Sequence, residues 1–176
     1  MTGVIDVKKI FLLATFLFFV MSATAQAEIF PHCMPLEEMS VGGVGYGCTL
    51  DYVKKIYGEP VDKKIFIGDG VRVVTLIYSE YFSVTARTSA EDTTPENDLQ
   101  VVGYSLKNNS LSTPAGLTVG MNYNEVVKHW GRGELVQADD RRGYFYVPAY
   151  VQLPVTLTFY VDANAKITEI ELGTDF

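Results

Sequence analysis

The sequence contains few of the residues that form metal centres and nucleophilic active sites. Its 176 residues include only two histidines and two cysteines. The histidines, His32 and His129, are far apart and show no ligand spacing, whereas metal binding needs clustered ligands. A nucleophile turn of the form Gly-x-Ser-x-Gly is also absent from the sequence. The sequence therefore predicts no metal, no cofactor and no enzyme activity.

Positive charge is scarce as well. Fourteen Lys and Arg residues stand against 21 Asp and Glu residues, which gives a net charge of −7. A surface with this balance repels phosphate backbones and anionic lipid. We therefore expect no nucleic-acid partner.

No apolar run is long enough to span a membrane. The longest, Ile10–Met21, has about a dozen residues, whereas a spanning helix needs about 20. Lys8 and Lys9 precede this run and the small residues of Ala25-Gln-Ala27 follow it, which is the order of a signal peptide. We predict a cleaved signal peptide over residues 1–27, export to the periplasm or the exterior, and no transmembrane anchor after cleavage. A retained membrane anchor is the alternative.

The two cysteines, Cys33 and Cys48, both follow the predicted signal peptide. An even pair in an exported chain favours a disulfide bond. A closed loop of about 15 residues would stabilise the fold by roughly 3 kcal/mol in the chain-entropy model. A reactive thiol pair is the alternative, but there is no Cys-x-x-Cys spacing to support it. We predict a structural bridge.

One short pattern of residues occurs twice in the chain, with an offset of 73. Each copy has a glycine turn, a short amphipathic stretch and a terminal glycine, formed by Gly43, Gly47, Val53 and Gly58 and then by Gly116, Gly120, Val126 and Gly131. The spacing of apolar residues predicts a helix over about 49–57 and a second one before Gly131. Sequence that alternates between apolar and polar residues follows each helix and predicts strands.

The duplication predicts the organisation of the whole chain. We expect an entry segment at 28–42, a first repeat at 43–107, a linker at 108–115 and a second repeat at 116–176. The predicted fold class is α+β, with two tandem repeats, each a short helix followed by a three- or four-stranded antiparallel meander. The helices would pack on one side of the sheet, since neither element is stable alone. The sequence leaves open whether the repeats share one sheet.

The repeat resembles two related families, the SmpA/OmlA-type outer-membrane assembly lipoproteins and the β-lactamase inhibitor protein. The likeness is carried by Gly43-Val-Gly-Tyr-Gly47 with Val53, Tyr57-Gly-Glu-Pro60, and Gly116-Leu-Thr-Val-Gly-Met121 with Val126 and Trp130-Gly131. The second copy departs from the pattern, because Gly131-Arg-Gly133 lacks the proline, and the chain lacks the lipid-modified cysteine of the assembly proteins. The resemblance implies a binding role, in which inhibitors of this type hold a partner on a concave sheet face and its loops.

Tyrosines provide the candidate contact surface. Tyrosine on an open sheet face anchors protein contacts well, and the candidates are Tyr81, Tyr144, Tyr146, Tyr150 and Tyr160. The leading hypothesis is an exported, monomeric, non-catalytic binding or structural module, inhibitor-like or assembly-factor-like, that contacts another protein in the cell envelope or outside the cell. The alternatives are a small envelope hydrolase with an unrecognised site, and a sensor that binds a small apolar ligand.

Overall fold

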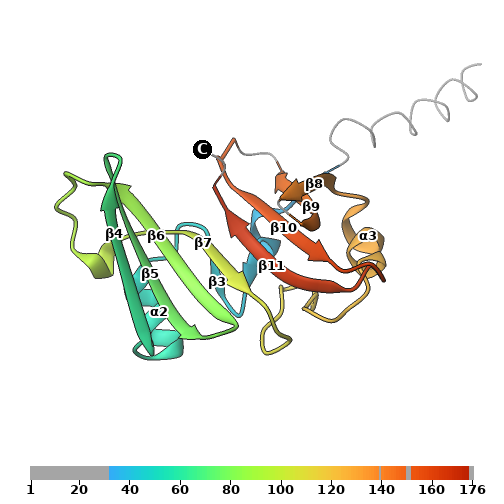
Figure 1. Cartoon of the computed structure of the whole chain (residues 1–176), viewed down its shortest axis with the longest axis horizontal. Coiled ribbons are helices and arrows are strands. Elements are labelled where there is room, and N and C mark those ends of the chain that lie inside the picture. The colour runs from blue at the N-terminus through green and yellow to red at the C-terminus, as the bar shows by residue number, and fades with distance from the viewer. Residues whose placement is uncertain (1–31, 139, 150–151, 175–176) are drawn as a thin grey trace, which may run out of the picture. The chain divides into compact units, whose positions relative to one another are not determined.

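The computed structural model describes residues 32–138, 140–149 and 152–174. The predicted signal peptide, the first residues of the entry segment and Tyr150 lie outside this part of the chain. The described residues form two α-helices, two 3-10 helices and eleven strands (Figure 1). None of the helices in this part of the chain is long and apolar enough to cross a bilayer.

Nine of the strands belong to one sheet, in the order β1-β9-β10-β11-β7-β6-β5-β4, with β8 pairing beside β9. Their bounds are β1 Cys33–Met34, β4 Asp62–Gly68, β5 Val71–Ser79, β6 Phe82–Ser89, β7 Val101–Leu106, β8 Glu134–Ala138, β9 Arg141–Pro148, β10 Thr156–Val161 and β11 Ile167–Gly173. The two halves of the chain meet where β7 pairs antiparallel with β11. β2 (Ser40–Val41) and β3 (Val44–Gly45) form a separate two-stranded ribbon.

The predicted α+β fold class is wrong. The structure is mostly β, and the sheet is mixed because β1, from the entry segment, pairs parallel with β9. Hydrogen bonds therefore join the entry segment to the second half of the chain, and the expected arrangement of helix-plus-meander repeats with helices packed on one sheet does not hold. Strand pairing determines the fold class here, because strands joined edge to edge satisfy backbone N–H and C=O groups that the ends of a short helix leave unpaired.

Both helices are short and have glycines at their C-terminal ends. In α2 (Leu50–Tyr57), the Thr49 hydroxyl accepts a hydrogen bond from the Tyr52 backbone N–H at 3.2 Å, as expected of an N-cap. Gly58 then ends the helix at a φ of 78°, a backbone region that glycine adopts without steric cost. In α3 (Asn124–Trp130), Gly131 has the same role at a φ of 72°.

The disulfide predicted between Cys33 and Cys48 is not formed, and both thiols are free. Cys33 lies in β1, whereas the Cys48 carbonyl accepts a hydrogen bond from the N–H of Val101 in β7 at 2.7 Å. β1 and β7 are four strand positions apart, which is roughly 19 Å along the sheet. A disulfide needs Cα atoms within about 7 Å, so the recruitment of β1 to the far half of the sheet separates the pair.

Candidate functional site

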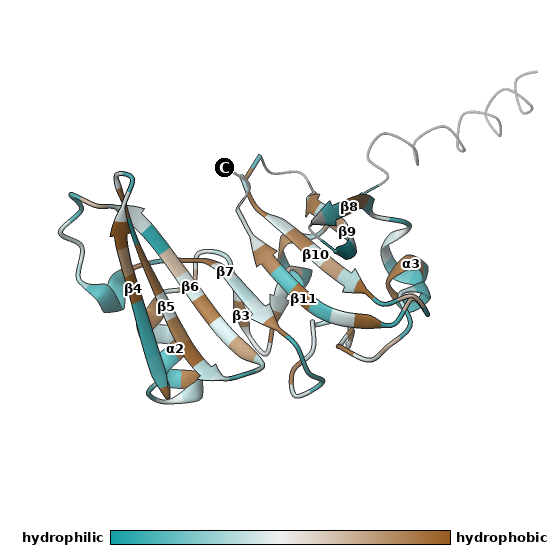
Figure 2. Cartoon of the chain, in the orientation of Figure 1, coloured by the Kyte–Doolittle hydropathy of each residue, from teal (hydrophilic) through white to brown (hydrophobic). Residues whose placement is uncertain are grey.

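The two faces of the sheet carry different side chains. In β6, Phe82, Val84 and Ala86 are buried, and the residues between them point the other way and stay partly or fully exposed. Strict alternation places successive side chains on opposite faces, and the bands of hydropathy along β6 and β11 show it (Figure 2). We call the face opposite the core the open face. Its residues, followed through the strand pairing, include Val73, Thr75, Ser83, Thr85, Arg87, Gly103, Ser105, Arg141, Gly143, Phe145, Thr156, Thr158, Tyr160, Glu169, Glu171 and Gly173.

The open face is hollowed over β5, β6, β7 and β11. The hollow has a volume of about 240 Å³, and its floor includes Gly103 and Gly173. These two glycines lie on neighbouring strands, and a Cβ placed on Gly103 would lie 3.8 Å from the Gly173 Cα. The wall carries one cationic side chain, one acidic side chain and several hydroxyls, contributed by Arg87, Glu171, Ser83, Thr85, Ser105 and Thr174. The depth of the hollow thus comes from two residues without side chains.

Beside the hollow, the open face is closed by a charged network. Glu169 is only 8% exposed, and its carboxylate accepts hydrogen bonds from the Ser105 hydroxyl at 2.6 Å and from Arg141 at 2.9 Å. Lys107 lies 3.7 Å from the same carboxylate. The Arg141 guanidinium also lies over the Tyr160 ring, 4.1 Å from its centroid. Each charge of Glu169 and Arg141 is therefore balanced within the chain.

Glu171 links this network to the hollow. Its carboxylate is 3.7 Å from Arg141, and its side chain lines the hollow. Burial raises the pKa of Glu171 above its ordinary value, and the negative charge of Glu169 raises it further, while Arg141, Lys107 and a hydrogen bond from the Tyr160 side chain act in the opposite direction. The carboxylate of Glu171 thus has partners in the charged network, and its side chain also lines the hollow.

The tyrosines predicted as partner contacts do not form one surface. Tyr144 and Tyr146 belong to the core, and the Tyr146 hydroxyl donates to the Gly131 carbonyl at 2.8 Å, which fixes the end of α3. Tyr160 is on the open face but is only 8% exposed. Tyr81, in the turn between β5 and β6, is 42% exposed. Tyr150 lies outside the described residues.

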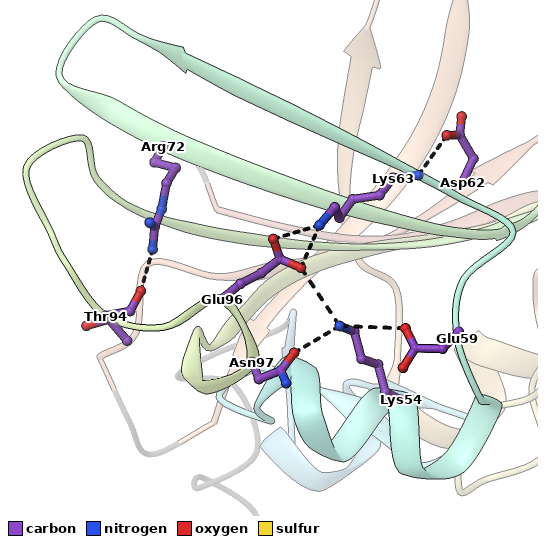
Figure 3. A network of polar contacts seen from close by, with 8 residues as sticks. All are labelled: Lys54, Glu59, Asp62, Lys63, Arg72, Thr94, Glu96 and Asn97. Carbon is purple, nitrogen blue, oxygen red and sulfur yellow. Dashed lines mark hydrogen bonds and ion pairs between the residues drawn. The ribbon is translucent and has the colours of Figure 1, made fainter.

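The loop between β6 and β7 is held by a polar network that connects it to β4 and α2 (Figure 3). Lys63 donates to Glu96 at 2.9 Å, and Lys54 of α2 donates to Asn97 at 2.9 Å. Arg72 donates to the Thr94 carbonyl at 2.7 Å. Glu96 lies in η2 (Glu96–Asp98), so the network connects the loop, the helix and the edge strand. This loop is structural and lies away from the hollow.

Sequence reasoning missed the residues of the hollow, although the sequence carries a signal for some of them. The alternation of Ser83, Thr85 and Arg87 with apolar residues in β6 places all three on one face, as does that of Glu169 and Glu171 in β11. Nothing in the sequence indicates that β7 and β11 are neighbours. The pairing of the two glycines on the floor therefore became visible only in the fold.

Among the residues that the structure describes, no three His, Cys, Asp or Glu side chains are grouped to hold a metal ion. His32 lies 3.7 Å from Glu134 and packs edge-on against the Phe145 ring. It thus has local partners at the edge of the sheet. The open face thus presents hydroxyl, charged and bare backbone groups.

The chain is thus in the class of mostly β proteins. It has one large mixed sheet, and one face of that sheet is polar and hollowed. No protein-family model matches the sequence, and no curated protein sequence matches it either. The solved structures that match the chain include an extracellular protein containing an SCP domain from Bacillus anthracis str. Ames. It matches with a TM-score of 0.45 and 13% identity over 73% of this chain and 44% of that one, so the chain spans less than half of that protein.

Two further solved structures are similar at 13% identity. A DUF4309 family protein from Bacillus subtilis subsp. subtilis str. 168 has a TM-score of 0.40, with 72% of this chain and 78% of that chain covered. A proposed beta-lactamase inhibitor protein from Streptococcus mutans has a TM-score of 0.30, with 88% and 95% covered. These scores do not assign the chain to a family. None of the three is described as an SmpA/OmlA-type protein.

Proposed function

We propose that the chain is an exported, non-catalytic binding module that holds another protein of the cell envelope or the extracellular space on its open face. The observation that carries the proposal is the hollow of about 240 Å³ on a sheet face that has charged groups and hydroxyls around it. Sheet faces of this kind accept protruding groups of a partner, with buried contacts at the centre and polar contacts at the rim. The signal peptide predicted over residues 1–27 supports the compartment.

The size of the hollow favours a protein partner over a free small ligand. Sites for small molecules typically have volumes of about 300–1,000 Å³ and bury most of the ligand. A hollow of about 240 Å³ that opens on a sheet face holds one side chain of a larger partner more readily. The hollow on the open face does not support the alternative of a sensor, because that hypothesis places an apolar ligand between helix and sheet.

The carboxylates favour binding over hydrolysis. A hydrolase would need a carboxylate free to take or give a proton at the substrate. Glu169 is 8% exposed, and both of its oxygens already have partners, one in Ser105 and the other in Arg141. Glu171 is then the acidic side chain that lines the hollow. One carboxylate can recognise a partner, whereas hydrolysis by two carboxyl groups needs an acid–base pair.

Affinity capture from an envelope extract tests the proposal. The mature wild-type chain is compared with Thr85→Arg, which places a long side chain in the hollow, and with Thr93→Arg, which places the same side chain on the exposed loop between β6 and β7. We expect one protein to be retained by the wild type and by Thr93→Arg and to be lost with Thr85→Arg. Equal retention by all three chains, or no protein above background, would contradict the proposal.

A further inference from the structure

A third glycine on the open face, Gly143, shows how this sheet covers a bare position elsewhere. Gly143 in β9 is paired directly with Tyr160 in β10. A Cβ on Gly143 would come within 3.0 Å of the Tyr160 ring and 2.9 Å of the Thr158 methyl group, so the ring occupies the space that a side chain would fill. An aromatic side chain that covers a cross-strand glycine in this way restores the packing that the glycine lacks.

The floor of the hollow has two such glycines and no ring over them. Gly103 is paired with Thr85 on one side, and Gly173 is paired with Thr156 on the other. Thr75 continues this row beyond Thr85. All of these neighbours have short side chains, which cannot reach across two bare positions, whereas an aromatic ring can reach a diagonal neighbour in a sheet.

The two glycines have different causes in the structure. A Cβ on Gly103 would lie 2.7 Å from the Leu172 carbonyl oxygen, so the close approach of β7 and β11 requires glycine there. A Cβ on Gly173 would meet nothing within 4 Å. Gly173 does not have a left-handed backbone, so neither sterics nor backbone conformation requires glycine at this position. The absence of a side chain at Gly173 keeps the floor of the hollow open.

We infer that the hollow is a docking notch for an aromatic side chain of the bound partner, with its ring over Gly103 and Gly173. This inference rests on the proposed function and names the chemistry of the partner's anchor. The ring covers the bare backbone as the Tyr160 ring covers Gly143. A volume of about 240 Å³ suits one aromatic side chain, and aromatic anchors in such pockets dominate binding energy at interfaces.

The rim of the notch favours tyrosine over phenylalanine. Glu171 lines the notch, and its carboxylate, which interacts with Arg141 and Tyr160, has lone pairs to accept a further hydrogen bond from a phenolic O–H. The hydroxyls of Ser83 and Ser105 also line the notch. A phenylalanine ring would cover the glycines equally well but would donate no hydrogen bond to these groups.

Amide chemical shifts of the full mature chain, followed by NMR, test the inference with defined probes. N-acetyl-tyrosinamide, N-acetyl-phenylalaninamide and N-acetyl-leucinamide are titrated separately. We expect saturable shifts centred on Gly103, Gly173 and Ser105, with affinity decreasing in that order of probes. Shifts spread over the surface, or equal shifts with the leucine probe, would overturn the inference.

A plugged variant and its control complete the test. Gly173→Val places a branched side chain in open space in β11, and Thr168→Val changes an exposed residue of the same strand outside the notch. Tyrosine-probe affinity should fall by about tenfold or more in Gly173→Val, as for loss of an interface anchor, and stay unchanged in Thr168→Val. Thr85→Leu, which fills the notch from β6, should act like Gly173→Val. Unchanged affinity in both plugged variants would overturn the inference.

The result also separates the inference from the proposed function. If a partner is captured and Thr85→Arg releases it, but Gly173→Val does not weaken it and the tyrosine probe does not bind, the aromatic notch is wrong and the binding function stands. If the tyrosine probe binds in the notch but Thr85→Arg still retains every captured protein, the proposed function is contradicted, and with it the role of the notch in holding a partner.

Discussion

The open face has two regions with bare backbone, and they are filled differently. At Gly143, the Tyr160 ring covers the glycine and Arg141 lies over the ring at 4.1 Å. At Gly103 and Gly173, the chain supplies no ring, and a hollow of about 240 Å³ remains. Both regions belong to the same sheet and the same face.

The fold requires glycine at 103, where β7 and β11 approach closely, but it does not require glycine at 173. The hollow therefore depends in part on residue choice. Packed interiors leave few voids, and proteins usually fill a gap next to a glycine. The chain does so at Gly143 with an aromatic, a cation and a buried carboxylate. The open position at Gly173, where the backbone permits any side chain, is the observation that supports the proposal that the hollow binds a partner.

Removing the ring that closes the first region should have the largest effect. Tyr160→Ala should lower the free energy of unfolding by about 3 kcal/mol, the low end of the range for aromatic-to-alanine changes, because Tyr160 is 8% exposed and carries the Arg141 contact. Urea denaturation measures this loss. The variant should also expose Gly143, and the tyrosine probe should then shift the Gly143 amide.

The exposed Tyr81 provides the control for that experiment. Tyr81→Ala should change the free energy of unfolding by less than about 0.5 kcal/mol, as is usual for surface substitutions. If Tyr160→Ala is as mild as Tyr81→Ala and opens no second site for the probe, Tyr160 does not fill the gap at Gly143, and the comparison fails.

Gly103→Ala should destabilise the protein by about 2 kcal/mol, in the range for overpacked sites. The added methyl group would meet the Leu172 carbonyl oxygen at 2.7 Å, so β7 and β11 must separate slightly. Chemical denaturation gives the size of the effect, and amide hydrogen exchange should show faster opening along these two strands. A neutral substitution would mean that the strands can separate at this point without cost.

Gly173→Ala should have the opposite sign. No atom lies within 4 Å of the added Cβ, and alanine restricts the unfolded chain more than glycine does, so we expect a gain of about 0.5 kcal/mol. The same denaturation experiment, run alongside Gly103→Ala, compares the two glycines on the floor of the hollow. A loss of stability would show that Gly173 is required by the fold, which would remove the argument that the hollow is kept open.

Glu171→Gln should have the smallest effect, and one that depends on pH. Burial raises the folded-state pKa of Glu171, so the folded protein holds this proton more tightly than the unfolded chain. The contribution of Glu171 to the stability of the wild type therefore falls as the pH rises from the ordinary glutamate pKa through the raised pKa of the folded protein. The glutamine variant should be more stable than the wild type above that window and equal to it below, in denaturation curves recorded across pH. If the glutamine variant were more stable by the same amount at every pH, the raised pKa of Glu171 would be contradicted.

The sequence predicted local structure better than it predicted pairing between segments that are distant along the chain. The helix bounded by Thr49 and Gly58 is found where expected, because caps and left-handed glycines act within a few residues. The alternation in β10 also puts Leu157 and Phe159 in the core. These features depend on neighbours in the sequence, so a single sequence can reveal them.

The errors concern segments that meet only in the fold. The predicted fold class was wrong because the structure is mostly β, with one nine-stranded mixed sheet. The pairing of β1 with β9, more than a hundred positions away, makes that sheet mixed, and the predicted disulfide is not formed. The candidate site shows the same limit. Glu171 and Ser105 become neighbours through pairing between β11 and β7, whereas Tyr144 and Tyr146, chosen for residue type, are core residues.

Site-specific photo-crosslinking tests most directly the claim that the open face is the working surface. A photoreactive phenylalanine is introduced singly at Thr75 and Thr156, which lie on the open face outside the lining of the hollow, and at Thr93 and Thr168 as exposed controls, and each protein is irradiated in envelope extract. The account predicts one common crosslinked partner from both open-face positions and none from the controls. Crosslinks from the controls alone, or with equal yield from all four positions, would contradict it.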